Sequence, residues 1–310
     1  MKIVRLMGGL GNQMLQYAFG KSISIITNEE VLFDKINFEE RKKEEIGNTG
    51  FDKYGVSIRN YELDIFNLDI QFATEKQIKQ CINQKVVGWK IPGLIRKIIN
   101  KPKYITNNII KEIPVNVFNP DFLEVKGDAY YEGYFHCDKY FNNIEDIIRK
   151  AFEFPPVTTQ YNIDLLEKIT GSENAASIHV RRGDYLNLPN FKKDMCCMSY
   201  FKKSAAYIAS KVSNPTFFVF CAEDPEWIQN NFDIEFPFEL IGVENIGPNA
   251  YYENMRLMSL CKHNIIVNSS YSWWGAWLNR NPDKIVIAPE PWFGDISDPI
   301  RDSWIRIQKS

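Results

Sequence analysis

Short apolar runs alternate with amphipathic stretches at the start of this chain. Residues 3–7 (IVRLM) form an apolar run followed by glycines, as in a buried strand, and residues 12–26 carry apolar side chains at helical spacing. A strand, a glycine turn and a helix in this order predict the opening of an α/β unit. Residues 31–33 are expected to form the next strand.

The alternation becomes regular again beyond residue 175. The expected strands are residues 177–180, 216–220, 239–243, 264–267 and 284–288, and the expected helices are residues 251–261 and 272–278. Strands that alternate with helices predict a parallel, doubly wound sheet. Ligands of such sheets bind at the carboxyl ends of the strands, which is where the polar motifs of this chain lie.

The middle of the chain is less regular. Scattered aromatic residues, prolines and glycines over residues 35–160 define few elements, so we place a domain boundary near residue 160. This gives an N-terminal α/β domain (residues 1–160) and a C-terminal α/β domain (residues 161–310). Residues 85–111 contain seven Lys or Arg and no acidic residue. They form either a surface helix with a basic face or a patch that contacts anionic lipid or an acidic glycan.

Composition narrows the class of protein. The 310 residues are 45% hydrophobic and 14% aromatic, enough for a sizeable core, and the net charge of −2 argues against a nucleic-acid partner. Six cysteines without C-x-x-C spacing predict reduced thiols and no zinc site. No apolar run approaches the roughly 20 residues that span a bilayer. We expect a cytoplasmic protein whose only membrane contact is peripheral, at the inner face.

A glycine-rich turn follows the first predicted strand. In residues 7–14 (MGGLGNQM), Gly9 and Gly11 fit the first two positions of the dinucleotide fingerprint G-x-G-x-x-G, but Met14 stands at the third. An NAD-dependent oxidoreductase is therefore disfavoured. A turn with few side chains lets a ligand approach backbone amides at a helix N-terminus. Asn12 and Gln13 then offer amides to sugar hydroxyls, unless the segment is only a tight turn.

The densest group of candidate ligands follows strand 177–180, in the segment SIHVRRGDY. Arginine presents a planar fork that fits phosphate oxygens, and Arg181 and Arg182 should point in different directions, so that one faces a ligand while the other packs or pairs. Asp184 can orient an arginine or accept a proton, and His179 is more often structural at a strand position. The alternative is a surface Arg–Asp ion pair, worth about 0–1 kcal/mol.

Two further polar groups follow predicted strands. Glu223 or Asp224 can accept hydrogen bonds from guanine N1–H and N2–H₂, whereas Asp224, which precedes Pro225, can equally cap a helix. Residues 268–278 (NSSYSWWGAWL) place hydroxyls and an amide at a predicted helix N-terminus, which binds anions, although the serines can also simply cap that helix. The candidate ligands there are Asn268, Ser269, Ser270 and Ser272. The tryptophans of the same segment, expected mostly in the core, are Trp273, Trp274 and Trp277.

Together these motifs resemble those of one enzyme family. GGLGNQM, HVRRGDY, AEDPEW and NSSYSWWGAWL, with the late PEPWF, stand in the order typical of bacterial α-1,2-fucosyltransferases. The resemblance implies two Rossmann-like α/β domains facing a cleft, as in the GT-B fold, with GDP-fucose bound mainly by the C-terminal half. It also implies that Arg181 holds the β-phosphate, that the serines of NSSYS assist, and that the enzyme inverts the donor anomeric centre without a metal or cofactor.

The resemblance thus implies transfer of L-fucose from GDP-fucose to O2 of a terminal galactose in a glycan acceptor. Asp184 is our preferred base, and Glu132 is second. The D-x-D/E-like triplet Asp233-Ile234-Glu235 lies in an apolar aromatic stretch, which agrees with metal-independent transfer. The alternatives are another GDP-sugar transferase, a protein O-fucosyltransferase and a non-catalytic sugar-binding module.

Overall fold

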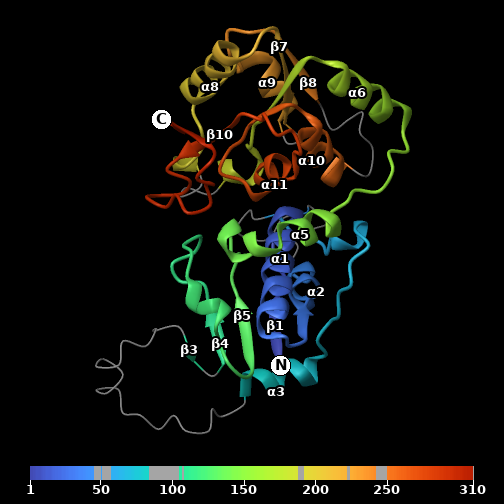
Figure 1. Ribbon diagram of the computed structural model, residues 1–310, viewed down its shortest axis with the longest axis vertical. Coiled ribbons are helices and arrows are strands. Elements are labelled where there is room, and N and C mark those ends of the chain that lie inside the picture. Colours follow the sequence, from blue (N-terminus) through green and yellow to red (C-terminus); the bar gives the residue numbers. More distant parts are fainter. Residues whose placement is uncertain are drawn as a thin grey trace. The chain divides into compact units, whose positions relative to one another are not determined.

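Two compact units make up the chain. The computed structural model describes residues 1–44, 50, 57–83, 105–106, 108–187, 192–221, 224–241 and 250–309 (Figure 1). The first unit comprises Met1–Lys43 and Arg59–Ala151, and the second comprises Glu44–Ile58 and Phe152–Ser310. Each unit contains its own largely parallel sheet, which confirms the predicted α/β class. Most of the basic segment, residues 85–104 and 107, lies outside the described residues.

The second unit begins before the boundary that the sequence suggested. The Phe152 ring meets the Trp274 ring edge-on, with 5.1 Å between their centroids. Arg256 donates a hydrogen bond to the Pro155 carbonyl oxygen at 2.7 Å. These contacts attach residues 152–159 to the second unit, although this segment carries no periodicity that would place it there.

The first unit is built on a five-stranded sheet in the order β2-β1-β5-β4-β3. All neighbouring strands are parallel except β3 and β4, which are antiparallel. The strands are β1 (Lys2–Arg5), β2 (Val31–Asp34), β3 (Ile105–Thr106), β4 (Ile109–Lys111) and β5 (Ala129–Glu132). The first two strands were predicted from sequence, and β3, β4 and β5 were not.

Helices and short turns surround this sheet. The α-helices are α1 (Leu10–Thr27), α2 (Ile36–Lys42), α3 (Glu75–Asn83) and α5 (Glu145–Ala151). The 3₁₀ turns are η1 (Leu63–Ile65), η2 (Pro120–Leu123), η3 (Asp138–Tyr140) and η4 (Asn142–Ile144). Helix α1, predicted from sequence, packs against β1 and β2 (Figure 1). Its Phe19 ring stacks on Phe135 at 3.8 Å between centroids and meets Tyr131 edge-on, so aromatic contacts hold the less regular middle of the chain to α1.

The second unit is built on a six-stranded parallel sheet in the order β11-β10-β9-β6-β7-β8. The strands are β6 (Asn174–His179), β7 (Pro215–Phe220), β8 (Phe238–Ile241), β9 (His263–Ile265), β10 (Val286–Glu290) and β11 (Ile305–Gln308). The five strands predicted in this half are confirmed. Edge strand β11 was missed, because none of its four residues is fully buried and its apolar signal is short.

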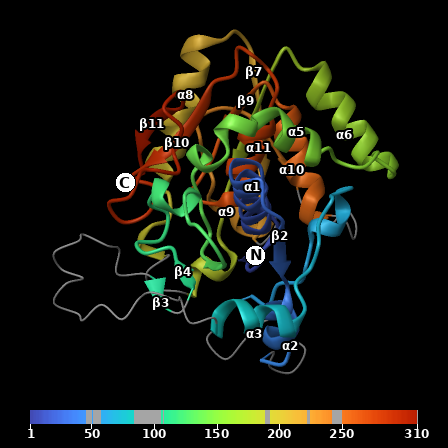
Figure 2. The same ribbon diagram turned by 60° about the horizontal axis from the view of Figure 1, so that its bottom comes forward.

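Helices cover both faces of this second sheet (Figure 2). They are α6 (Gln160–Gly171), α8 (Met198–Lys211), α9 (Pro225–Asn231), α10 (Ala250–Leu260) and α11 (Ser270–Leu278), and η5 (Gly183–Leu186) is a 3₁₀ turn. Alternate residues of β6 point to opposite faces. Ile178 and Val180 join a core with apolar residues of α8 and α9, whereas Ser177 accepts a hydrogen bond from Asn264 and the His179 ring lies 5.8 Å from Tyr271 of α11.

Three tryptophans of α11 form the centre of one core layer. Trp273, Trp274 and Trp277 are each at most 1% exposed, and their ring centroids lie 5.0–6.2 Å apart. The Trp273 indole donates a hydrogen bond to the Pro299 carbonyl oxygen at 2.7 Å. The prediction that these tryptophans lie mostly in the core is confirmed.

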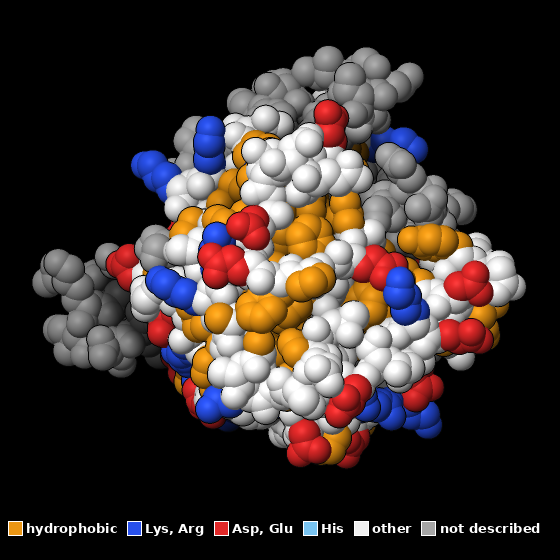
Figure 3. Space-filling model, turned by 90° about the horizontal axis from the view of Figure 1, so that it is seen from above, with side chains coloured by type: hydrophobic (Ala, Val, Ile, Leu, Met, Phe, Trp, Pro, Cys, Tyr) orange, Lys and Arg blue, Asp and Glu red, His pale blue; other side chains and the backbone are white. Residues whose placement is uncertain are grey.

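The surface carries mixed charges. On the face in Figure 3, acidic and basic side chains are interspersed around hydrophobic ones, without a broad area of one sign among the described residues. Within the described ranges, no helix is both long enough and apolar enough to cross a membrane.

Gly20 of α1 provides a test of the packing of the first unit. Replacing a mid-helix glycine with alanine normally stabilises a helix by roughly 0.5–1 kcal/mol. Here an added Cβ would lie 2.7 Å from Phe33 Cζ and 3.3 Å from Val31 Cγ1. We therefore expect Gly20→Ala to lower the free energy of unfolding by about 1–3 kcal/mol, measured by urea denaturation.

The matched control is Gly171→Ala, at the end of α6, where no atom lies within 4 Å of the added Cβ. This control should leave stability unchanged or slightly higher. Equal effects of the two substitutions would contradict the packing described for α1.

Candidate functional site

The order of strands in the second sheet creates a crevice at the carboxyl end of β6. The chain adds β7 and β8 on one side of β6 and then crosses over to add β9, β10 and β11 on the other. Because connections leave the sheet in opposite directions at such a switch point, the ends of β6 and β9 stay uncovered, and α/β proteins bind ligands there. The segments HVRRGD and NSSYS emerge from these two strands.

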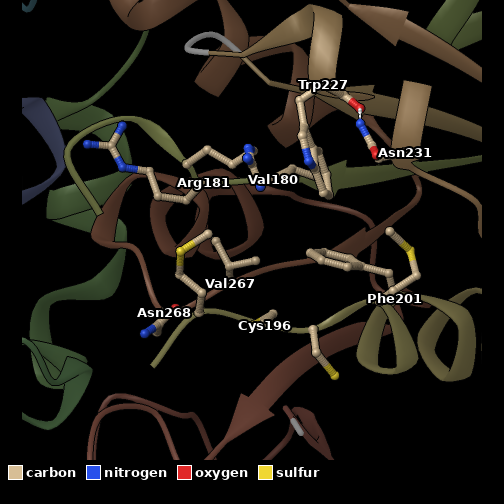
Figure 4. Close-up of a pocket in the computed structure, with 12 residues that line it drawn as sticks. Val180, Arg181, Cys196, Phe201, Trp227, Asn231, Val267 and Asn268 are labelled. Carbon is tan, nitrogen blue, oxygen red and sulfur yellow. Dashed lines mark hydrogen bonds between the residues drawn. The ribbon is translucent and has the colours of Figure 1, made fainter. Parts of the chain in front are cut away.

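A cavity of about 250 Å³ lies at this switch point (Figure 4). Its walls come from the segments that follow β6 and β9, from the segment before α8 with the first turn of that helix, and from α9. Its lining includes Val180, Arg181, Arg182, Phe201, Trp227 and Asn268. The structure thus brings together three of the residues that the sequence singled out, both arginines and Asn268.

The Arg182 side chain binds other residues of the second unit. Its Nε donates to Asp224 Oδ2 at 2.8 Å, and its guanidinium lies 3.7 Å from the centre of the Trp227 ring. Asp224 also accepts the backbone N–H of Trp227 at 3.2 Å, so it caps α9. Of the two sequence interpretations of Asp224, capping is the one realised in this structure. Asp224 and Trp227 together fix the direction of the Arg182 side chain.

Arg181 points elsewhere. Its side chain extends away from Trp227 (Figure 4), and its guanidinium lies 5.3 Å from the centre of the Tyr185 ring. The Tyr185 hydroxyl donates to the Asn268 carbonyl oxygen at 3.0 Å, which links the turn after β6 to the end of β9. The expectation that one arginine pairs while the other points in a different direction agrees with these contacts.

The start of α11 lies beside these groups. Ser269 caps the helix, because its Oγ accepts the Tyr271 backbone N–H at 3.4 Å. Ser272 is fully buried, and its Oγ bonds to the backbone of Val267 and Ser269. Asn268 donates its amide to the Asp194 carbonyl oxygen at 2.9 Å. Ser270, at the first helical position, is only partly buried and is the most accessible of the three candidate serines.

His179 is neutral at the end of β6. Burial, together with the nearby positive charge of Arg181, lowers the pKa of His179 to about 3. Its Nδ1 is buried and has no hydrogen-bond partner among the described residues. A neutral imidazole beside Arg181 adds no positive charge to the site.

The glycine turn in the first unit carries a polar side chain, Gln13, that binds the neighbouring backbone. Gly9 is the N-cap of α1, and Gly11 lies within the helix and is buried. The fully buried Gln13 amide donates to the carbonyl oxygens of Gly8 and Asn60 and accepts the Glu62 backbone N–H, at 2.8–2.9 Å. Gln13 therefore holds neighbouring backbone in this structure, whereas Asn12 is half-buried.

The other acidic candidates differ in what surrounds them. Glu132 at the end of β5 pairs with Arg5 at 2.7 Å and with Lys111 at 3.1 Å. The backbone of Asp184 lies in η5, directly after the arginines. The Asp184 side chain and all of Glu223 lie outside the described residues.

The D-x-E triplet has a local partner. Asp233 and Glu235 are both exposed and pair with Lys202 at 3.3 and 3.0 Å. Within the described ranges there is no group of three or more His, Cys, Asp or Glu residues that could hold a metal ion.

A doubly wound sheet with arginine and a helix N-terminus at its switch point places this chain among α/β proteins whose strand ends suit phosphorylated ligands. Comparison with known proteins is more specific, because the model of Glycosyl transferase family 11 matches residues 97–307. The chain belongs to this glycosyltransferase family. The resemblance inferred from the motifs is thereby confirmed.

Two relatives match nearly the whole chain. An α-1,2-colitosyltransferase of Escherichia coli is 31% identical, over 99% of both chains. The O-antigen biosynthesis glycosyltransferase WbnK of Escherichia coli is 30% identical, over 97% of this chain and 99% of the relative. A galactoside 2-α-L-fucosyltransferase of Caenorhabditis elegans is 21% identical, over 53% of this chain and 45% of its own.

Solved structures of fucosyltransferases are more distant. A mutant of Arabidopsis thaliana FUT1 in complex with GDP matches with a TM-score of 0.48 and 12% identity, over 94% of this chain and 71% of its own. The NodZ α-1,6-fucosyltransferase soaked with GDP-fucose matches with a TM-score of 0.47 and 15% identity, over 97% of each chain.

The buried histidines give a test of the electrostatics. Burial lowers the pKa of all three, His136 and His179 to about 3, and His263 by a smaller shift, from the ordinary value of 6.5. Below about pH 6.5 the unfolded chain therefore binds more protons than the folded one, and stability falls as pH falls. Each histidine contributes a slope of at most about 1.4 kcal/mol per pH unit.

We expect His179→Gln to reduce the loss of stability between pH 7.5 and 5.5, because the glutamine does not titrate. Urea denaturation at both pH values, followed by tryptophan fluorescence, measures the difference. The same pH dependence in the wild type and the variant would show that His179 is not held neutral.

Proposed function

We propose that this protein is an inverting glycosyltransferase that moves L-fucose from GDP-fucose to O2 of a terminal galactose. The observation that carries the proposal is the juxtaposition of Arg181 and Asn268 at the switch point of the second sheet, in a chain of glycosyl transferase family 11. Names of relatives and neighbours support the choice of a GDP-linked 6-deoxy sugar and of an α-1,2 linkage.

The proposed reaction is a single displacement at the sugar C1. As the bond from C1 to the β-phosphate oxygen breaks, negative charge grows on the diphosphate. Arg181 and the N-terminus of α11, with Ser270 at its first position, stabilise that charge without a metal ion. Arg182 holds its place against Asp224 and Trp227 and supports the turn. Glu223 remains our candidate for guanine recognition.

Colitose is the second candidate for the transferred sugar. The 31% identity to an α-1,2-colitosyltransferase over the full length of both chains favours it. Colitose differs from fucose in lacking the 3-hydroxyl group, so both donors place the same leaving group and the same C1 in the site. The acceptor in either case is a glycan that ends in galactose.

A panel of donors and acceptors tests this proposal directly. We expect transfer from GDP-fucose, or from GDP-colitose, to lactose, lacto-N-biose or N-acetyllactosamine, with a new bond to galactose O2 located by NMR. Because the proposed charge stabilisation needs no metal, the rate should be unchanged in EDTA. Product linked to another hydroxyl would refute the acceptor assignment, and strict Mn²⁺ dependence would refute the role given to Arg181.

Substitution of Arg181 tests the diphosphate ligand. We expect Arg181→Ala to lower kcat/KM by about 10²–10³-fold, because a preorganised donor to the leaving group is lost. GDP affinity, measured by calorimetry, should also fall. The control is Arg280→Ala, which removes an exposed arginine of the same unit that pairs only loosely with Glu153, at 3.7 Å. Equal activity of both variants would remove Arg181 from the mechanism.

A further inference from the structure

One aspartate joins the segments that follow four strands of the second sheet. Asp194 lies between η5 and α8, in the segment that follows β6. Its carbonyl oxygen accepts from the Asn268 amide, after β9, at 2.9 Å, and its Oδ1 accepts the Gly294 backbone N–H, after β10, at 3.2 Å. The Lys309 ammonium, directly after β11, donates to the same Oδ1. The carboxyl ends of β6, β9, β10 and β11 are therefore linked through a single residue.

The ion pair between Asp194 and Lys309 is poorly solvated. The Lys309 side chain is only 9% exposed, and that of Asp194 is 16% exposed. The Lys309 backbone is held as well, because its N–H donates to the Glu290 carbonyl oxygen at 3.3 Å and its carbonyl oxygen accepts the Cys197 N–H at 3.0 Å. Removing the lysine charge would leave the Asp194 carboxylate at this depth without that countercharge, which is costly. The pair therefore fixes the two segments against each other.

This pair is connected directly to a residue of the cavity. Asn268 is 4% exposed and lines the cavity together with Arg181. Both side chains extend to the same side of the pocket in Figure 4. The Asn268 side-chain amide donates to Asp194, and the Asn268 backbone carbonyl oxygen accepts from the Tyr185 hydroxyl at 3.0 Å. Asn268 is thus held from two directions, and its place in the cavity wall depends on Asp194 as well as on Tyr185.

Charge gives a physical reason for a lysine at position 309. The ligand proposed for the neighbouring strand ends is a diphosphate, which is negatively charged. A carboxylate on the residue that holds Asn268 would repel this ligand, since charges interact strongly over several ångströms in a partly buried site. Lys309 cancels the charge of Asp194 without displacing the hydrogen bond from Gly294. Arg181 then attracts the ligand without an opposing charge at this edge of the cavity.

We propose that Asp194 and Lys309 are positioning residues for the donor diphosphate. This inference rests on the proposed function above. Asp194 holds Asn268 in the cavity wall, and Lys309 removes the negative charge that Asp194 would otherwise direct at the diphosphate. Neither side chain touches the reacting atoms, because both act through Asn268 and through the electrostatic potential at Arg181. The four linked strand ends form one preorganised support for the leaving group.

Lys309→Met tests the charge, because methionine keeps much of the apolar stem and loses the ammonium. We expect the Kd for GDP, measured by calorimetry, to rise about tenfold, because the Asp194 carboxylate then repels the diphosphate. The Kd for GMP, which lacks the β-phosphate, should rise less. The melting temperature should fall, because a buried carboxylate loses its countercharge, so binding is measured well below it. A loss of packing alone would not distinguish the two nucleotides.

Two further variants separate charge from packing. Lys309→Arg keeps the positive charge and should bind GDP nearly as well as the wild type does. Asp194→Asn combined with Lys309→Met leaves both positions neutral, while the backbone carbonyl oxygen of residue 194 can still accept the Asn268 amide. We therefore expect this double variant to recover most of the GDP affinity that Lys309→Met loses. Both variants avoid a buried carboxylate without a countercharge, so they fold even if the single variant does not.

Lys202→Met is the matched control. Lys202 of α8, in the same unit, pairs with Asp233 and Glu235, which are both exposed, so its substitution should change neither Kd. An unchanged Kd for GDP in Lys309→Met would overturn the inference, as would equal losses for GDP and GMP, or a double variant that binds GDP no better than Lys309→Met. No binding of GDP by the wild-type protein would instead refute the proposed function itself. The two failures are therefore distinguishable.

Discussion

The parallel pairing of β6 with β7 on one side and β9 on the other determines where chemistry can take place in the second unit. The chain adds β7 and β8 on one side of β6 and β9, β10 and β11 on the other, so no connection covers the carboxyl end of β6. A buried amide secures the pairing: Asn264 Nδ2 donates to Ser177 Oγ and to the Met258 carbonyl oxygen, both at 2.8 Å. Asn264 thus links β9 to β6 and to α10, and the cavity at the strand ends depends on this register.

The two arginines after β6 have different surroundings, although they are adjacent in one motif. Arg182 is only 14% exposed, and a charge so poorly solvated needs a partner within the fold. Asp224 supplies that partner while it caps α9, so the loop after β7 is tied to the loop after β6. The neighbouring Arg181 instead rests near Tyr185, whose hydroxyl is bonded to the end of β9. Fixing Arg182 therefore determines the direction in which Arg181 leaves the strand.

The elements that were predicted correctly from sequence are those whose apolar residues form a continuous run or recur at helical spacing, such as β6, β7 and helix α1. Strands β4 and β5 were missed, since their residues lie among scattered aromatics that pack on Phe19 through contacts distant in sequence. The same limit applies to the site. Arg181 and Asn268 belong to local motifs after strands, whereas the pairing of Arg182 with Asp224 joins two loops that only the fold brings together. Sequence also cannot show that the amide of Gln13, which was predicted as a ligand, forms hydrogen bonds to neighbouring backbone groups.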